Sequence, residues 1–168
     1  SFADKPGKNI KNIQETELTL YLASKDGKGL TKEVQNVYYN SNTSVEKLAV
    51  ERLMKQPETE GAKSAIPEGT HLINVSVLDG VCLVNFDEGF LVQNYDIAEP
   101  VVIYSIVDSL TELPSVNTVQ ISVNGETNMT YREDYSLSKQ YERNLDLVTE
   151  ENQDVNIIVE ERGEKGEN

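Results

Sequence analysis

Alternating apolar and polar positions predict two strands near the start of the chain. Three leucines alternate with polar residues over 17–23, and the glycine-rich stretch 25–29 predicts a turn after them. A second strand is predicted over 32–39, where Val34 and Val37 fall at positions of opposite parity. This change of parity predicts a β-bulge or an irregular strand edge.

Two stretches carry apolar residues at helical spacing. In the first, Thr43 and Glu46 fit a capping box, and Pro57 ends the apolar pattern. The second stretch begins at Pro100 and ends at Leu113, just before another proline. Its polar face is predicted to point outward: Ser105, Asp108, Ser109 and Glu112.

The strongest local signal is a β-hairpin over 72–86 that turns at Asp79-Gly80. A two-residue Asp-Gly loop favours a type I′ turn and fixes the register of the two strands. This register pairs Leu78 with Val81 and places six side chains on the core face: Ile73, Val75, Val77, Cys82, Val84 and Phe86. We therefore expect the single thiol to be buried and unreactive.

The last core strand is predicted over 119–123, followed by a tight turn at Asn124-Gly125. The stretch 131–147 is expected to wrap the sheet, with three anchors: Leu137, Tyr141 and Leu145. The order β-β-α-β-β-α-β predicts an α+β fold, in which two helices pack on one face of a mainly antiparallel sheet.

The two ends of the chain differ in composition from its middle. We interpret residues 1–14 as a linker, 15–149 as one domain and 150–168 as an acidic C-terminal tail. Residues 154–160 have the composition of a strand, so they are either an added strand at a sheet edge or part of a solvated tail.

Composition excludes several classes of function. The chain has 168 residues, and its 15 basic and 29 acidic side chains give a net charge of −14, which argues against nucleic acid as a partner. No apolar run reaches the roughly 20 residues of a membrane-spanning helix. One cysteine and one histidine leave no disulfide framework, no cysteine-rich zinc site and no partner for histidine-based catalysis. We expect no metal, no cofactor and no enzymatic activity.

Few residues remain as candidates for chemistry or binding. His71 is interpreted as a surface residue, and Asp87-Glu88 as a solvated turn, because adjacent acids that leave a strand diverge and cannot flank a glycosidic bond. Tyr38 and Tyr39 are neighbours on one strand, so one of them must point outward. A surface tyrosine can anchor a protein or sugar partner, and these two residues are the candidate interface.

Two long stretches, Ile66–Phe90 and Tyr104–Gly125, resemble the GerMN domain family of sporulation and spore germination proteins. The resemblance implies a fold similar to ring-building motifs, which pack side by side into rings, and an envelope lipoprotein anchored outside the cytoplasmic membrane. The family pattern matches eight positions, which we interpret as residues that maintain the fold: Pro67, Gly69, Thr70, Gly80, Val84, Leu110, Asn124 and Gly125.

The sequence therefore predicts a non-catalytic, extracytoplasmic GerMN module that acts as an envelope scaffold or protein-binding domain in sporulation and spore germination. Its expected partners are envelope or sporulation proteins, with self-association as one form of binding. The alternative is a module of a cell-surface lipoprotein that binds peptidoglycan or another glycan.

Overall fold

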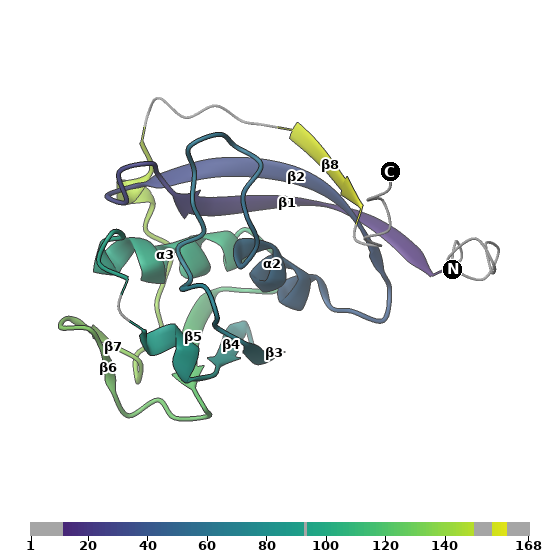
Figure 1. The fold of residues 1–168 in the computed structure, drawn as a ribbon. Helices are drawn as coiled ribbons and strands as arrows, with labels where there is room; N and C mark the ends of the chain where they lie inside the picture. The colour runs from purple at the N-terminus through teal and green to yellow at the C-terminus, as the bar shows by residue number, and fades with distance from the viewer. Residues whose placement is uncertain (1–11, 93, 150–155, 161–168) are drawn as a thin grey trace.

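Two three-stranded sheets enclose the helices in a computed structural model that describes residues 12–92, 94–149 and, in its backbone, 156–160 (Figure 1). The strand order of the first sheet is β1 (Ile13–Ala23), β2 (Leu30–Asn40), β8 (Asn156–Glu160). The strand order of the second sheet is β3 (Leu72–Leu78), β4 (Val81–Phe86), β5 (Thr118–Val123). Each sheet is mixed, with an antiparallel pair and a parallel pair.

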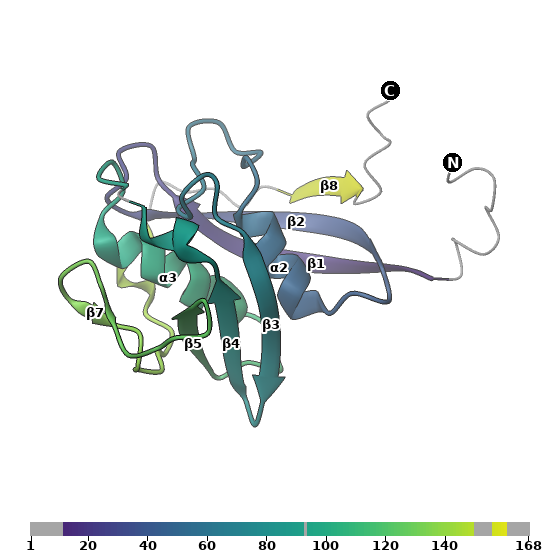
Figure 2. The same ribbon diagram turned by 60° about the horizontal axis from the view of Figure 1, so that its bottom comes forward.

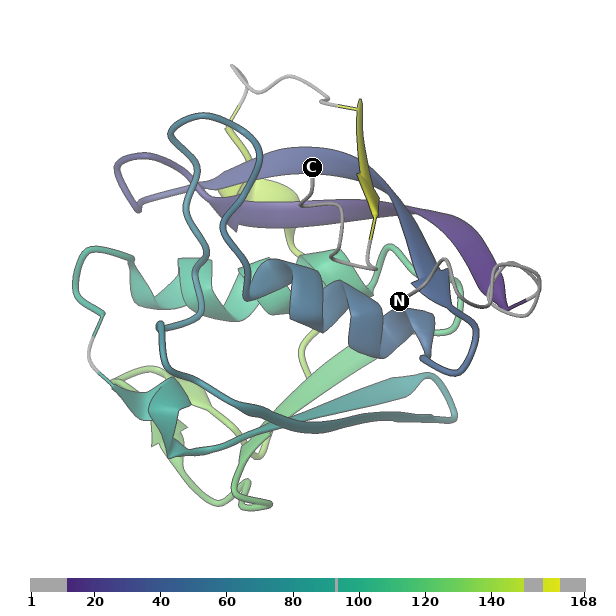
Figure 3. The same cartoon turned by 45° about the vertical axis from the view of Figure 1, so that its right-hand side comes forward.

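Helices α2 (Val45–Leu53) and α3 (Glu99–Leu110) lie between these two sheets (Figure 3). Helix α3 packs on β1 and β5, whereas α2 packs on β1 and β3. The α+β class with two helices is confirmed. The strands, however, are divided between two sheets on opposite sides of the helix pair, and do not form the single sheet that the sequence predicted.

The polar face of α3 explains this difference. Ser105 and Ser109 were predicted to face solvent, but both are buried against β1, and Asp108 of the same face is buried as well. The Ser105 hydroxyl donates to the carbonyl of Tyr21 at 2.6 Å, and the amide of Tyr21 donates to Ser109 Oγ at 2.8 Å. The serine side chains of α3 thus provide hydrogen-bond partners for the free edge of β1. A hydrophobic pattern along the sequence does not predict this contact.

Strands β1 and β2 pair in one continuous register from Ile13 to Ala23, so the predicted bulge is wrong. Glu33, Gln35 and Val37 keep the core-facing parity of β2, and all three are buried. The two polar residues are accommodated because Gln35 donates to the Glu33 carboxylate at 2.6 Å and accepts from Arg52 at 3.1 Å.

Helix α2 begins one residue later than its sequence suggested. Its N-cap is Ser44, whose hydroxyl accepts from the amide of Lys47 at 3.1 Å, so the capping box on Thr43 is wrong. Thr43 and Ser44 both carry a hydroxyl, and only the backbone conformation determines which of them caps the helix.

The β3–β4 hairpin has the predicted turn at Asp79-Gly80, where both residues have positive φ. Cys82 is fully buried, as expected. The register shifts between Leu72 and Asn74, so Leu72 takes the place opposite the final phenylalanine of β4. Ile73 therefore is 50% exposed, and its predicted core position is wrong.

The chain after β5 covers the free edge of the second sheet. It forms a short hairpin of β6 (Thr130–Tyr131) and β7 (Tyr135–Ser136), which lies at the lower left in Figure 2. The anchors Leu137 and Tyr141 are buried, but Leu145 is 43% exposed and does not anchor the wrap. Strand β8 lies within 154–160 and pairs parallel to β2. Residues 1–11 and the rest of the tail lie outside the described residues.

Candidate functional site

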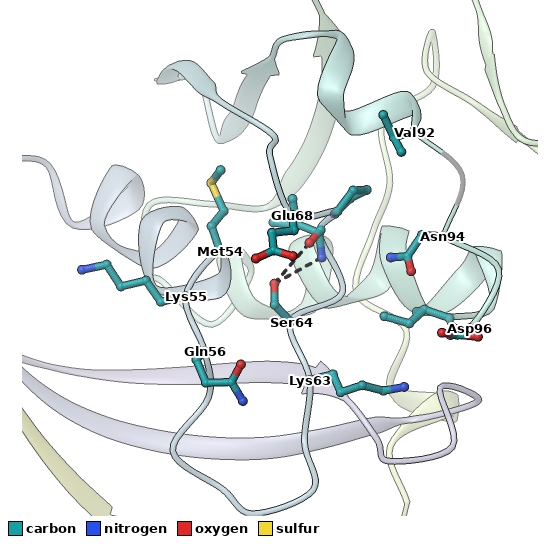
Figure 4. Close-up of a pocket in the computed structure, with 12 residues that line it drawn as sticks. Met54, Lys55, Gln56, Lys63, Ser64, Glu68, Val92, Asn94 and Asp96 are labelled. Carbon is teal, nitrogen blue, oxygen red and sulfur yellow. Dashed lines mark hydrogen bonds between the residues drawn. The ribbon is translucent and has the colours of Figure 1, made fainter.

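Two loops on one side of the molecule form the walls of an open pocket of about 580 Å³ (Figure 4). The first loop follows α2, and the second lies between the 3-10 helix Glu88–Leu91 and α3. The first loop and the end of α2 contribute eight lining residues: Met54, Lys55, Gln56, Lys63, Ser64, Ile66, Pro67 and Glu68. The second loop contributes four: Val92, Asn94, Asp96 and Ile97.

The first wall is held by hydrogen bonds to its backbone. Ala23 and Lys63 exchange two backbone hydrogen bonds, both of 2.9 Å, which extend the edge of β1 into the loop. The Ser64 hydroxyl donates to the carbonyl of Leu53 at 2.6 Å and ties the loop to the end of α2. These bonds fix the loop at two places: strand β1 and the end of α2.

A buried carboxylate also supports this wall. Glu33 accepts from the amides of Thr59 at 2.8 Å and Glu58 at 3.3 Å. Burial alone would raise the pKa of the Glu33 carboxyl, but the hydrogen bonds from Thr59, Gln35 and Glu58 outweigh it and hold the pKa below its usual value. The carboxylate therefore stays charged and keeps its hold on the loop at neutral pH.

The second wall is clamped from both sides. The guanidinium of Arg132 donates to the carbonyls of Asn94 and Ile97, each at 2.7 Å. On the other side, the amide of Ala98 donates to the carbonyl of Gly27 at 2.9 Å. Gly27 has φ +74°, and a Cβ placed there would lie 1.8 Å from a backbone oxygen of the loop, so only glycine fits this approach.

One side-chain bond joins the two walls, because Asn94 Nδ2 donates to the carbonyl of Ala65 at 3.4 Å. Val92 lines the pocket and is 57% exposed, and Tyr95, which stands between two lining residues of the same loop, is 79% exposed. The pocket is therefore preformed, with a rigid backbone and an exposed apolar rim.

The candidate interface of the sequence lies elsewhere. Tyr38 and Tyr39 are half-buried near the end of β2, opposite Glu15 and Gln14, and neither lines the pocket. Tyr39 packs partly against the core. Their role as an interface stays a prediction.

The acid pair beside β4 is divided between two local partners. Asp87 accepts from the backbone amide of His71 at 3.0 Å and lies 2.8 Å from its ring Nδ1. Hydrogen bonds, led by the one from the His71 amide, lower the pKa of Asp87. Glu88 instead accepts from Asn124 Nδ2 at 2.9 Å. The two carboxylates therefore serve different turns and do not face a common cleft.

Two buried groups have strongly shifted pKa values but cannot reach a substrate. Burial raises the pKa of the Cys82 thiol to about 12, so it is not a nucleophile at neutral pH. Burial likewise raises the pKa of Asp108 to about 6, although the amide of Asn144 donates to it at 3.0 Å. Asp108 is fully buried under the first sheet, which makes it a structural group.

Sequence reasoning missed the pocket. Tyr95 and Glu68 stand in loops without periodicity, and the loop of Tyr95 is held by Gly27 and Arg132, which are distant in sequence. The described residues form no cluster of three or more metal-binding side chains. None of their helices has the length and apolar character needed to cross a membrane.

The fold and this site define a small α+β module with an open pocket between two loops, lined by two acids and two lysines among other residues. The sequence model of the Germane family, described as "Sporulation and spore germination", matches residues 19–128, and the chain belongs to this family. This match confirms the resemblance seen in the sequence. A search of curated proteins found no match.

Solved structures share the fold. The tandem GerMN domains of the sporulation protein GerM from Bacillus subtilis align with a TM-score of 0.65 and 22% identity, over 80% of this chain and 48% of that one. The chain thus spans about half of that structure. The first GerMN domain of GerM aligns at 0.59 and 21% identity, over 72% of this chain and 92% of that one. A candidate lipoprotein from Clostridium perfringens aligns at 0.53 and 19% identity, over 76% and 87%.

Proposed function

We propose that the protein is a non-catalytic, extracytoplasmic module that binds other envelope proteins and acts as a scaffold in sporulation or spore germination. Membership of the sporulation and spore germination family supports the process. The shared fold with a candidate lipoprotein supports an envelope location.

The observation that carries the proposal is the exposure of Val92 and Tyr95 on a loop whose backbone is held by hydrogen bonds at Asn94, Ile97 and Ala98. Large apolar side chains on a rigid loop bind a partner at a small entropic cost, and tyrosine is enriched among the residues that dominate interface energies. The clamp by Arg132 and Gly27 gives this loop the rigidity that the argument needs.

The reactive groups support a binding role over catalysis. The thiol and the most perturbed carboxyl, Cys82 and Asp108, are fully buried, while Asp87 and Glu88 are each engaged by their own turn. Acid–base catalysis requires a titratable group within hydrogen-bonding reach of the substrate, and neither Cys82 nor Asp108 lines the pocket.

Site-specific photo-crosslinking in the source cells during spore formation tests this proposal. A benzophenone amino acid replaces Tyr95 in one variant and Leu78 in the control, because Leu78 is 75% exposed on the hairpin turn and lies outside the pocket. We expect the Tyr95 variant alone to crosslink to one defined envelope protein, identified by mass spectrometry. Identical adducts at both positions, or adducts to wall glycan only, would contradict the proposal.

A further inference from the structure

An unpaired carboxylate lies in the middle of the pocket. Glu68 follows the buried Pro67 and precedes Gly69, which has φ +93° and no neighbouring atom where a Cβ would be. Figure 4 shows its carboxylate beside Met54, in the space between the two loops. Among the described residues no cation forms an ion pair with Glu68, and the same holds for Asp96 at the edge of the pocket.

The surface around Glu68 is apolar. Ile66, Pro67 and Ile97 are buried and form the floor, while Met54 and Val92 stand at the sides. An aliphatic chain can pack on this floor, with a charged group at its end placed beside the carboxylate. Exposed Tyr95 stands between two lining residues of the second loop, and a cation is also attracted to an aromatic face.

Two lysines limit what the pocket can accept. The ammonium groups of Lys55 and Lys63 lie on opposite sides of the pocket, away from Glu68 (Figure 4). They repel an incoming cation at the edges but leave the central carboxylate open. The net charge of −14 draws basic molecules towards the protein.

The geometry points to this pocket as the recognition site for a lysine or arginine side chain, presented by an extended, apolar-flanked segment of a basic partner protein. The inference rests on the proposed function and names the chemistry of its partner. The aliphatic stem packs on Ile66, Pro67 and Met54, the cationic group pairs with Glu68, and the flanking apolar residues of the segment contact Val92 and Tyr95.

Amide chemical shifts of the full chain, titrated with short peptides, test the inference. The probe is acetylated and amidated Gly-Leu-Lys-Leu-Gly, and matched peptides carry Glu or norleucine in place of Lys. We expect saturable shifts at the pocket loops, with millimolar affinity for the Lys peptide and about fivefold weaker binding of the other two. Equal or tighter binding of the Glu peptide, shifts only outside the pocket, or no shifts at all would overturn the inference.

Three charge variants make the sign of the effect decisive. Glu68→Gln should weaken binding of the Lys peptide about five- to tenfold, because a charge-assisted contact is lost. Lys63→Gln should leave binding unchanged or strengthen it. Glu126→Gln, an exposed acid outside the pocket, removes the same charge and should change the affinity little. A pocket that prefers carboxylates would give the opposite results for Glu68→Gln and Lys63→Gln. Equal weakening by Glu68→Gln and Glu126→Gln would show that only the overall charge of the protein matters, and would overturn the inference.

The two proposals fail separately. A defined protein crosslinked at position 95, together with no binding of the Lys peptide, overturns the pocket chemistry and leaves the scaffold role standing. Binding of the Lys peptide with Glu68 dependence, together with adducts only to wall glycan, overturns the scaffold role.

Discussion

The buried carboxyl of Asp108 gives the clearest test of the energetics of this fold. It is fully buried on α3, its Oδ1 accepts from the amide of Asn144, and its Oδ2 has no hydrogen-bond partner among the described residues. Burial raises its pKa from the usual 3.8 to about 6, and the nearby Arg143, which itself lies 3.7 Å from Glu112, offsets this only in part. At neutral pH the fold therefore holds a charge that it solvates poorly.

The size and sign of the effect follow from proton linkage. The folded state binds the proton more tightly than the unfolded chain, so Asp108 lowers the free energy of unfolding progressively as the pH rises from about 4 through about 6. Above that window the full cost is about 3 kcal/mol. About half of it develops between pH 5 and pH 8, roughly a tenfold change in the unfolding equilibrium constant.

Asp108→Asn removes the charge and keeps the acceptor for Asn144. Urea unfolding followed by tyrosine fluorescence, which eight tyrosines and no tryptophan make practical, should show the variant gaining on the wild type by about 1.5 kcal/mol between pH 5 and pH 8. The exposed Asp146→Asn serves as the control and should show no such gain. A constant difference across this range, or a gain at the acid end, would refute the reasoning.

Other perturbations test single contacts of the fold. Gly27→Ala should lower the free energy of unfolding by about 2 kcal/mol or more, since its Cβ would meet the oxygen of Asp96; thermal melting measures this, and an unchanged melting temperature would disprove the close approach. Ser109→Ala leaves the buried amide of Tyr21 without its acceptor and should cost about 1–3 kcal/mol by urea titration, whereas stability equal to wild type would show that water replaces the bond. Cys82 should react with a thiol reagent only after unfolding; rapid labelling of the native protein would contradict its burial.

The sequence predicts those elements whose apolar pattern matches one face of a sheet or helix. The β3–β4 hairpin is the best example, because Asp79-Gly80 fixes both its turn and most of its register. Its one error, Ile73, arises where a bulge interrupts the alternation. Alternation can predict which face is buried, but it carries no signal for an inserted residue on an otherwise apolar strand.

Buried polar residues account for the errors on the polar face of α3 and in the parity of β2. Glu33, Ser105 and Asp108 look like solvent-facing residues, and each is fully buried because a distant segment supplies a hydrogen-bond partner. The loop at Thr59, strand β1 and the C-terminal wrap are those segments. A pattern along the chain cannot predict such pairs, since they depend on which segments the fold brings together.

Polar residues with distant partners also position the pocket. Glu33 holds the first wall through the amides of Glu58 and Thr59, and Arg132 holds the second through two carbonyls. A loop fixed through its backbone leaves its side chains free to face a partner, so little conformational entropy is lost when the partner binds. Burying polar groups lowers the stability of the fold. Here the buried anchors hold the loops that present Glu68 and Tyr95. Loosening either anchor should therefore weaken partner binding even though neither anchor faces the partner.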